Sequence, residues 1–418
     1  MNQPVRRIAL FGYLGSGNIG NDASLETVLA WLKSDHPNVE VQCITIAPHE
    51  VTARYGLPSV PLSWHSSGQS RSPVTEASRK LLGRLIDVPR SYALAGSVDA
   101  VIVPGMGVLE ESLGERPWGL PFGLFLMAAA CRLRNRRFVL LDVGAEWAVN
   151  PLTRRLYVAA VRRATHVSYR DRSSAAAMAR AGARDPEAIA PDLAFAHRAP
   201  RLADPESSRI VVGVMAYYGR QDDPIRGAEV RRRYVATMAD AMSELARVGD
   251  QVVLVGGDRV DVAVARDVRA AVLTASPGLP DDAVLVREFT TFTELTEEMM
   301  RADVVIASRF HNLICALRLA RPTISIGYAK KNRDLMRALG LAGYCQDIED
   351  LDTGLLVAQI QSARKDGEVL ADRIRRGTAD YAVEIDCLLE RVASEALGLV
   401  ALRRGIERQD EMDAWHGA

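Results

Sequence analysis

The sequence predicts an α/β protein with two consecutive Rossmann-like domains that face each other across a cleft. Three observations lead to this fold class: a length of 418 residues, short apolar runs that alternate with helical patterns, and a polar, Pro-containing break at 198–208. Strands that are apolar on both faces are typical of parallel sheets covered by helices. We therefore predict an N-terminal domain over 1–200, a C-terminal domain over 207–385 and a helical tail over 386–418.

The first half of the chain alternates between strand-like and helix-like patterns. Short β-rich apolar runs predict strands at 7–11, 39–46, 100–103, 138–142 and 166–169. Helices are expected between them at 23–33, 76–96, 122–134 and 151–164. In the first of these, Leu25, Val28, Leu29 and Leu32 recur at the spacing that places side chains on one buried face of a helix.

The same alternation restarts after the polar break. Strands are expected at 210–215, 251–255, 283–286, 304–307 and 323–326. The helices between them are expected at 231–248, 260–275, 293–301 and 311–319. From 355 to about 402 the pattern is almost wholly helical, and these C-terminal helices could pack back on the first domain.

Composition narrows the function classes. The 52 basic and 52 acidic residues balance, which argues against a nucleic-acid partner. Five scattered cysteines without a CxxC pair indicate a reducing compartment and predict neither a metal site nor a disulfide framework. The most apolar stretch, 118–131, is shorter than the ~20 residues of a membrane span. We expect a cytoplasmic protein without a transmembrane segment; a peripheral position at the inner face of the membrane is compatible with this.

A glycine-rich segment connects the first predicted strand to the first predicted helix, and it reads Gly12-Tyr13-Leu14-Gly15-Ser16-Gly17-Asn18-Ile19-Gly20-Asn21-Asp22. Such a loop can turn backbone N–H groups towards an anion at a helix N-terminus. The alternative is a tight turn capped by Asn21 or Asp22. Its GxGxxG spacing is a weak dinucleotide signal, because no acidic residue follows the second strand to hold a ribose. The ligand-binding candidates here are Gly15, Gly17, Asn18, Gly20 and Asp22.

Two polar clusters follow predicted strands. Ser308-Arg309-Phe310-His311 comes directly after the strand at 304–307, where ligands bind in open α/β sheets. Arginine suits a carboxylate or phosphate, and histidine exchanges a proton near neutral pH. Ser168-Tyr169-Arg170-Asp171 ends another strand, and there Asp171 or Ser173 as a helix cap, with Arg170 paired to Asp171, is an equally good interpretation.

Four segments in order resemble the polysaccharide pyruvyl transferase family, from about residue 8 to residue 348. They are the loop 12–20, Ser168-Tyr169-Arg170-Asp171 with Ser174, Pro191-Asp192-Leu193-Ala194-Phe195, and Ser308-Arg309-Phe310-His311 followed by Arg321-Pro322-Thr323-Ile324-Ser325. The resemblance implies a GT-B-like fold with the acceptor on the first domain and the donor on the second. It also implies transfer of an enolpyruvyl-derived group from phosphoenolpyruvate to two hydroxyls of a sugar, in a cell-surface polysaccharide or a lipid-linked precursor.

The resemblance places the reactive histidine at His311, with Arg309 beside the donor, and implies phosphoenolpyruvate as co-substrate with no other cofactor. A ligand with a carboxylate and a phosphate calls for several positive groups, for which Arg309, Arg170, Lys330 and Lys331 are candidates. Ser308 completes the expected substrate-binding set.

Two positions depart from the family pattern: Asn21 stands where an Asp is common, and Met106 interrupts a triple-glycine turn at Gly105-Met106-Gly107. Three alternatives therefore stay open. They are a GT-B glycosyltransferase that uses a nucleotide sugar, a catalytically degenerate glycan-binding scaffold and, as the least favoured, an NAD-dependent oxidoreductase.

Overall fold

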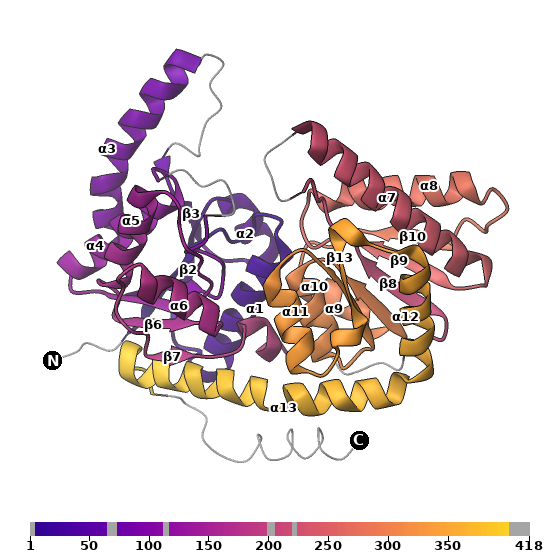
Figure 1. The fold of residues 1–418 in the computed structure, drawn as a ribbon. Helices are drawn as coiled ribbons and strands as arrows, with labels where there is room; N and C mark the ends of the chain where they lie inside the picture. The colour runs from indigo at the N-terminus through magenta and orange to yellow at the C-terminus, as the bar shows by residue number, and fades with distance from the viewer. Residues whose placement is uncertain (1–4, 65–72, 112–116, 199–204, 220–223, 401–418) are drawn as a thin grey trace. The chain divides into compact units, whose positions relative to one another are not determined.

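The computed structural model describes residues 5–64, 73–111, 117–198, 205–219 and 224–400 (Figure 1). Contacts divide the chain into two compact units. The first comprises the chain up to Leu14, Thr27–Asp192 and the chain from Asp386 onward; the second comprises Gly15–Glu26 and Leu193–Ile385. The expected range 1–200 placed the whole glycine-rich loop in the first domain, whereas the structure groups Gly15–Glu26 with the second unit. Residues 199–204 of the predicted linker lie outside the described residues.

The first unit contains a parallel sheet with the strand order β3-β2-β1-β4-β5-β6-β7. In its centre Leu10 of β1 pairs with Cys43 of β2 on one side and with Ile102 of β4 on the other. β4 is buried along its whole length, as expected for a strand covered on both faces. The bounds are β1 Arg7–Gly12, β2 Glu40–Thr45, β3 Ser59–Pro61, β4 Ala100–Pro104, β5 Arg137–Val143, β6 His166–Tyr169 and β7 Ala188–Ile189.

Helices α3, α4 and α5 pack next to one another in this unit. The helices that follow its strands are α1 Ile19–Asp35, α2 Pro48–Tyr55, α3 Pro73–Ser97, α4 Leu120–Leu133, α5 Pro151–Val161 and α6 Arg172–Arg180. Asp171 caps α6, since its Oδ1 accepts the N–H of Ser174 at 2.6 Å, which confirms one of the two predicted caps. Neither Asn21 nor Asp22 precedes α1, because that helix begins earlier than expected.

The C-terminal part of the chain joins the first unit, as the sequence suggested. After α13 (Gly367–Arg391) a π-helical turn, Val392–Leu397, packs on β5. Arg391 donates to the carbonyl oxygen of Glu187 at 3.4 Å. The division of α13 at Ile385 and Asp386 assigns its last turns to this unit.

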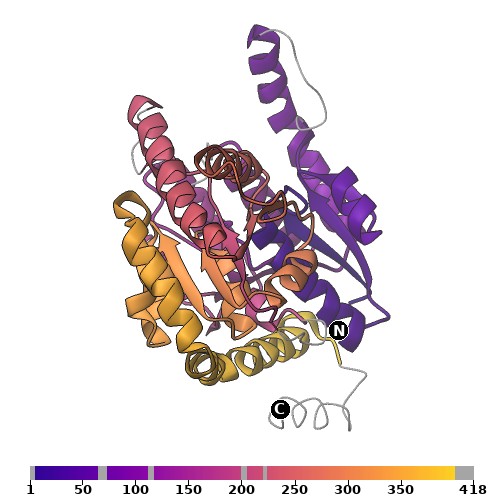
Figure 2. The same ribbon diagram turned by 90° about the vertical axis from the view of Figure 1, so that its right-hand side faces the viewer.

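The second unit has a parallel sheet with the order β10-β9-β8-β11-β12-β13. Helix α7 packs between α8 and α12, whereas α10 contacts α9 and α11 (Figures 1 and 2). The strands are β8 Arg209–Gly213, β9 Gln251–Val255, β10 Val284–Arg287, β11 Val304–Ala307, β12 Thr323–Gly327 and β13 Cys345–Asp347. The helices are α7 Pro224–Arg247, α8 Asp261–Ala275, α9 Phe292–Met300, α10 Phe310–Arg318, α11 Lys330–Ala338 and α12 Thr353–Lys365.

Both sheets follow the doubly wound order in which the first strand lies between the second and the fourth. The chain leaves this central strand in one direction and later returns to its other side, so each sheet has a topological switch point. The switch point lies between β1 and β4 in the first unit and between β8 and β11 in the second. Ligands in such sheets bind beyond the carboxyl ends of the strands at the switch point.

Candidate functional site

The switch point of the second unit carries the predicted Ser308–His311 segment. β11 ends at Ala307, Arg309 occupies the N-cap position of α10, and His311 lies in the first turn of that helix. The neighbouring strand β8 ends at Gly213, whose carbonyl oxygen accepts the N–H of Ser308 at 2.9 Å. The sequence therefore delivers an arginine and a histidine to the place where this fold binds ligands.

Arg309 is held by a carboxylate that the sequence analysis did not identify. Its Nε and Nη2 donate to Oδ2 and Oδ1 of Asp261 at 2.9 and 2.7 Å, in a two-pronged ion pair. Asp261 is fully buried and also accepts the N–H groups of Gly257 at 3.0 Å and of Ala216 at 2.8 Å. One carboxylate thus fixes the turns after β8 and β9 together with the guanidinium.

The ion pair defines the charge of Arg309. Burial alone lowers the pKa of this guanidinium, but the hydrogen bonds and charge of Asp261 outweigh burial and raise it. Two of its five N–H groups are used by Asp261, and the side chain is 26% exposed. The remaining N–H groups of a permanently charged, immobilised guanidinium can therefore bind an anion.

His311 packs directly against the backbone of Gly20. A Cβ atom at Gly20 would lie 2.0 Å from Nδ1 of His311, so no residue with a side chain fits there without moving the ring. This contact brings together two segments that are nearly 300 residues apart in sequence (311 − 20 = 291). Both belong to the second unit.

The glycine-rich loop is attached to the turn after β9. Ile19 donates to the carbonyl oxygen of Gly257 at 3.1 Å, and Arg259 donates to that of Gly17 at 3.0 Å. The side-chain amide of Asn18 adds a bond to Oδ2 of Asp258 at 3.1 Å. The loop and the Gly257 turn therefore form one continuous backbone surface beside His311.

Most loop amides have partners within the protein. Asp22 is fully buried, and its Oδ1 accepts the N–H of Gly15 at 2.8 Å, while Oδ1 of Asn18 accepts that of Gly20 at 3.0 Å. Gly15 and Gly17 adopt φ values of 68° and 89°, which favour glycine. These constraints account for the glycines at 15, 17 and 20 by backbone geometry and close approach alone.

Three other predicted residues of the second unit differ in their surroundings. Ser308 is buried, and its Oγ lies 3.1 Å from the hydroxyl of Tyr234, whose pKa burial raises to about 12. Lys331 Nζ lies 5.0 Å from the ring centroid of Phe310, between Arg309 and His311 in sequence. Lys330 is 85% exposed and lies 3.9 Å from Asp334. Lys331 therefore lies beside the first turn of α10, at Phe310, whereas Lys330 lies in solvent.

Arg170 belongs to the first unit and lies in a buried ion-pair network. Its Nη2 donates to Oε1 of Glu110 at 2.6 Å and its Nη1 to Oδ2 of Asp192 at 3.1 Å. The side chain is only 4% exposed. Both acids neutralise the guanidinium, which favours a structural role for Arg170, with Glu110 and Asp192 as the ion-pair partners in place of the expected Asp171.

Residues missed by the sequence analysis also line the strand ends of the second unit. Asn312 is fully buried, and a Cβ at Gly213 or Gly257 would lie 2.4 Å from its Nδ2 or 2.8 Å from its Oδ1. Tyr217 and Tyr328 stack with ring centroids 5.3 Å apart. No three potential metal-ligating His, Cys, Asp or Glu side chains cluster within the described residues.

A sequence model of the polysaccharide pyruvyl transferase family matches residues 18–330. The chain belongs to this family. The match includes the loop from Asn18, the Ser168–Asp171 segment and the Ser308–His311 segment, which confirms the resemblance seen in the sequence. Membership in the polysaccharide pyruvyl transferase family indicates a transferase that acts on a polysaccharide. No curated protein sequence matches the chain significantly.

Solved structures of low sequence identity share the fold. A Listeria monocytogenes protein assigned as a UDP-N-acetylglucosamine 2-epimerase has a TM-score of 0.61 at 12% identity, covering 97% of this chain and 100% of its own. The UDP-GlcNAc 2-epimerase of Neisseria meningitidis gives 0.58 at 10%, covering 92% and 100%. The Streptomyces nogalater glycosyltransferase SnogD gives 0.51 at 18%, covering 94% and 100%. This pyruvyl transferase family member therefore has a GT-B fold, and none of its described helices is both long and apolar enough to cross a bilayer.

Glu26 ties the loop segment to helix α9. Its carboxylate accepts the N–H groups of Phe292 and Thr293 at 3.0 and 3.1 Å and lies 2.9 Å from Nε2 of His197. Burial raises the pKa of Glu26, but the bonds from His197 and Thr293 outweigh burial, so the pKa is lowered. A lowered pKa means that the charged form stabilises the fold.

We expect Gly20→Ala to displace the His311 ring, because its Cβ would occupy the position of Nδ1. Overpacking of this kind costs about 1–3 kcal/mol of unfolding free energy. Denaturant unfolding and the imidazole proton resonances of His311 measure the two effects. Gly278→Ala is the control, since nothing lies within 4 Å of a Cβ there. An unchanged His311 resonance in Gly20→Ala would contradict the close approach.

We expect Glu26→Gln to lower the unfolding free energy by about 1.5–3 kcal/mol at neutral pH, the usual worth of hydrogen bonds to a charged group. Because the folded pKa is lowered, this stabilisation is complete above the ordinary pKa of glutamate and is lost as pH falls through the lowered value. The difference between wild type and variant should therefore shrink towards pH ~3. A difference in unfolding free energy that stays constant with pH would contradict stabilisation by the ionised Glu26 carboxylate. Glu244→Gln, at an exposed position of α7, should have no effect.

Proposed function

We propose that this protein transfers the enolpyruvyl-derived group of phosphoenolpyruvate to two hydroxyls of one sugar in a polysaccharide or its lipid-linked precursor. The observation that carries the proposal is the position of Arg309 and His311 at the start of α10, at the switch point of the second unit, within a chain of the polysaccharide pyruvyl transferase family. Lys331 lies over Phe310, the residue between them in sequence. Phosphoenolpyruvate is the co-substrate, and the chemistry requires no further cofactor.

Arg309 suits the anionic donor. Phosphoenolpyruvate carries a carboxylate and a phosphate, and a guanidinium fixed by Asp261 meets either group without first having to be ordered. Lys331, the lysine nearest to Phe310, adds a second positive charge. Because Nε and one N–H of Nη2 are bonded to Asp261, Arg309 would bind the donor through the two N–H groups of Nη1 and the second N–H of Nη2.

His311 is the proposed proton carrier. Its imidazolium gives a proton to the methylene carbon of phosphoenolpyruvate, which leaves a cationic centre at the carbon that bears the phosphate. One sugar hydroxyl attacks this carbon, and its proton returns to His311. Loss of inorganic phosphate and attack by the second hydroxyl close the ketal, with the proton of that hydroxyl leaving on phosphate. One substrate pair thus gives one ketal and one phosphate.

The donor can be identified by thermal shift and phosphate release. Phosphoenolpyruvate should raise the melting temperature, because a ligand that binds only the folded state stabilises it. Inorganic phosphate should appear only when a sugar with two free hydroxyls that one ketal can bridge is present. Stabilisation by a UDP- or GDP-sugar instead would favour a glycosyltransferase. Glycan binding without phosphate release would favour a degenerate scaffold. Quenching of the protein's intrinsic fluorescence by NADH would favour an NAD-dependent oxidoreductase.

Two substitutions separate the proposed roles. His311→Ala should lower kcat by about 10²–10⁴-fold with little change in donor affinity, the range for general acid–base catalysis. Arg309→Ala should chiefly raise the donor KM, because the donor loses about 1.5–3 kcal/mol of binding free energy. Arg309→Lys should recover part of this binding free energy. His49→Ala, at an exposed histidine, is the control. A His311→Ala enzyme that melts several degrees lower yet keeps full kcat would show a structural histidine.

A further inference from the structure

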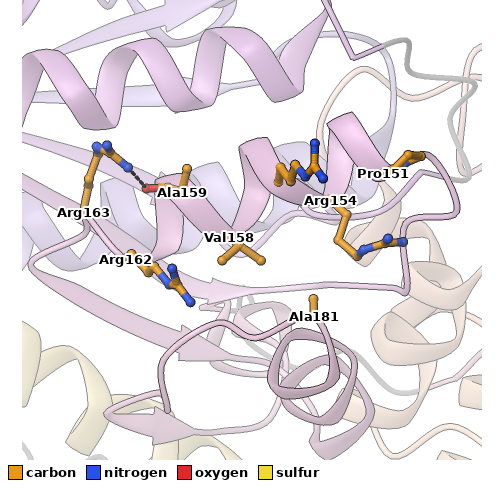
Figure 3. Close-up of a pocket in the computed structure, with 8 residues that line it drawn as sticks. Pro151, Arg154, Val158, Ala159, Arg162, Arg163 and Ala181 are labelled. Carbon is orange, nitrogen blue, oxygen red and sulfur yellow. Dashed lines mark hydrogen bonds between the residues drawn. The ribbon is translucent and has the colours of Figure 1, made fainter.

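A pocket of about 420 Å³ in the first unit is lined by four arginines of or directly after helix α5: Arg154, Arg155, Arg162 and Arg163. The other lining residues are small or apolar. The side chains of Arg162 and Val158 lie on the side of α5 that faces Ala181 (Figure 3). The volume lies within the usual range of small-ligand sites. The pocket shares no residue with the Arg309–His311 site.

None of these four arginines forms an ion pair with a carboxylate in the described part of the chain, and the pocket lining contains no acidic residue. The carboxylate of Glu111 accepts the N–H of Asn150, the residue before α5, at 3.2 Å, but Glu111 is not one of the residues that line the pocket. Four like charges in one hollow repel one another, which costs stability unless an anion offsets them.

Three of the arginines are fixed by groups that leave their charge intact. Arg154 donates to the carbonyl oxygen of Ala148, Arg162 to that of Gly182 and Arg163 to that of Ala159, at 2.7–2.8 Å. Arg154 also lies over the ring of Trp147 at 4.5 Å. Each guanidinium keeps N–H groups for a further acceptor. An immobilised guanidinium loses less entropy when it binds an anion.

Composition does not explain the cluster. Only five of the 52 basic residues are lysines, so arginine is the default basic residue of this chain. Acidic residues are equally numerous, so carboxylates are expected beside a cluster of four arginines. Arg170, for example, is paired with Glu110 and Asp192. A local surplus of positive charge within a concave surface therefore calls for an anionic ligand.

We propose that this pocket binds a phosphate or diphosphate group. Arginine recognises phosphate through paired N–H donors, and four arginines match a ligand with two or more negative charges. The group can belong to a soluble molecule or to a lipid headgroup. Val149 and Leu152, which flank the lining residue Pro151, are 79% and 37% exposed, so a membrane surface could contact apolar side chains next to the pocket.

Two probes distinguish these sources. Binding of inorganic pyrophosphate is measured by calorimetry, and binding to vesicles of phosphatidylglycerol or of phosphatidylcholine by sedimentation. Arg155→Glu is the main variant, because Arg155 is exposed and its replacement removes no ion pair or hydrogen bond with any residue that the structure describes. It should weaken binding about tenfold or more, and Arg162→Gln should act in the same direction. Arg132→Glu reverses a charge on α4 that is also exposed, and it should have little effect.

Each outcome decides the proposal. If Arg155→Glu loses pyrophosphate binding but still binds phosphatidylglycerol vesicles, the ligand is a soluble phosphate. If it loses phosphatidylglycerol binding but still binds pyrophosphate, the ligand is a lipid headgroup. Equal effects of Arg155→Glu and Arg132→Glu would reduce the pocket to general charge attraction and overturn the proposal. So would binding of neither probe, or pyrophosphate binding that only Arg309→Ala abolishes. If Arg155→Glu has a lowered melting temperature, the same measurements on Arg162→Gln, which keeps a polar side chain, still test the proposal.

Discussion

The close packing of side chains on glycine backbones is the constraint on which the second unit's strand-end site depends. Three polar residues at the start of α10 each occupy the place of a missing Cβ: Arg309 at Gly257, His311 at Gly20 and Asn312 at Gly213. The three glycines come from three separate segments of the chain. A side chain at any of them would displace the residue that meets it, so glycine at these three positions is what permits the observed placement of Arg309, His311 and Asn312.

Electrostatics acts on the same residues through Asp261. A fully buried carboxylate is costly unless its oxygen atoms are satisfied, and here two backbone N–H groups and a guanidinium satisfy them. The ion pair therefore has two consequences. It fixes the turns after β8 and β9, and it keeps a cation at the switch point where a mobile arginine would need to be ordered by the ligand. A positive group that is already fixed in place favours the binding of an anionic ligand.

The sequence predicted the parts of the fold that have a strong periodic pattern. The β6, β9 and β11 ranges agree with the structure to the residue, and β9 and β11 are mainly apolar runs with clear ends. The edge strands β3, β7 and β13 were not expected, since two or three residues show no alternation. In the site, the position of Arg309 and His311 followed from the end of β11. The contact of His311 with Gly20 and the ion pair of Arg309 with Asp261 could not be predicted, because both depend on tertiary packing. Nothing in the sequence distinguishes Asp261 from the nearby Asp258.

Arginine shows most clearly what composition cannot predict. Arg170 and the four arginines of the α5 pocket are the same residue type in one unit, and the chain as a whole is neutral. Arg170 is neutralised by Glu110 and Asp192, which lie 60 positions before it and 22 after it. Three of the pocket arginines, Arg154, Arg162 and Arg163, have backbone carbonyl oxygens as partners, and Arg154 also lies over an aromatic ring; such partners orient a guanidinium but remove none of its charge. Whether an arginine is neutralised inside the protein or keeps its positive charge at the surface is thus decided by where distant carboxylates fold, and a net charge of zero conceals both cases.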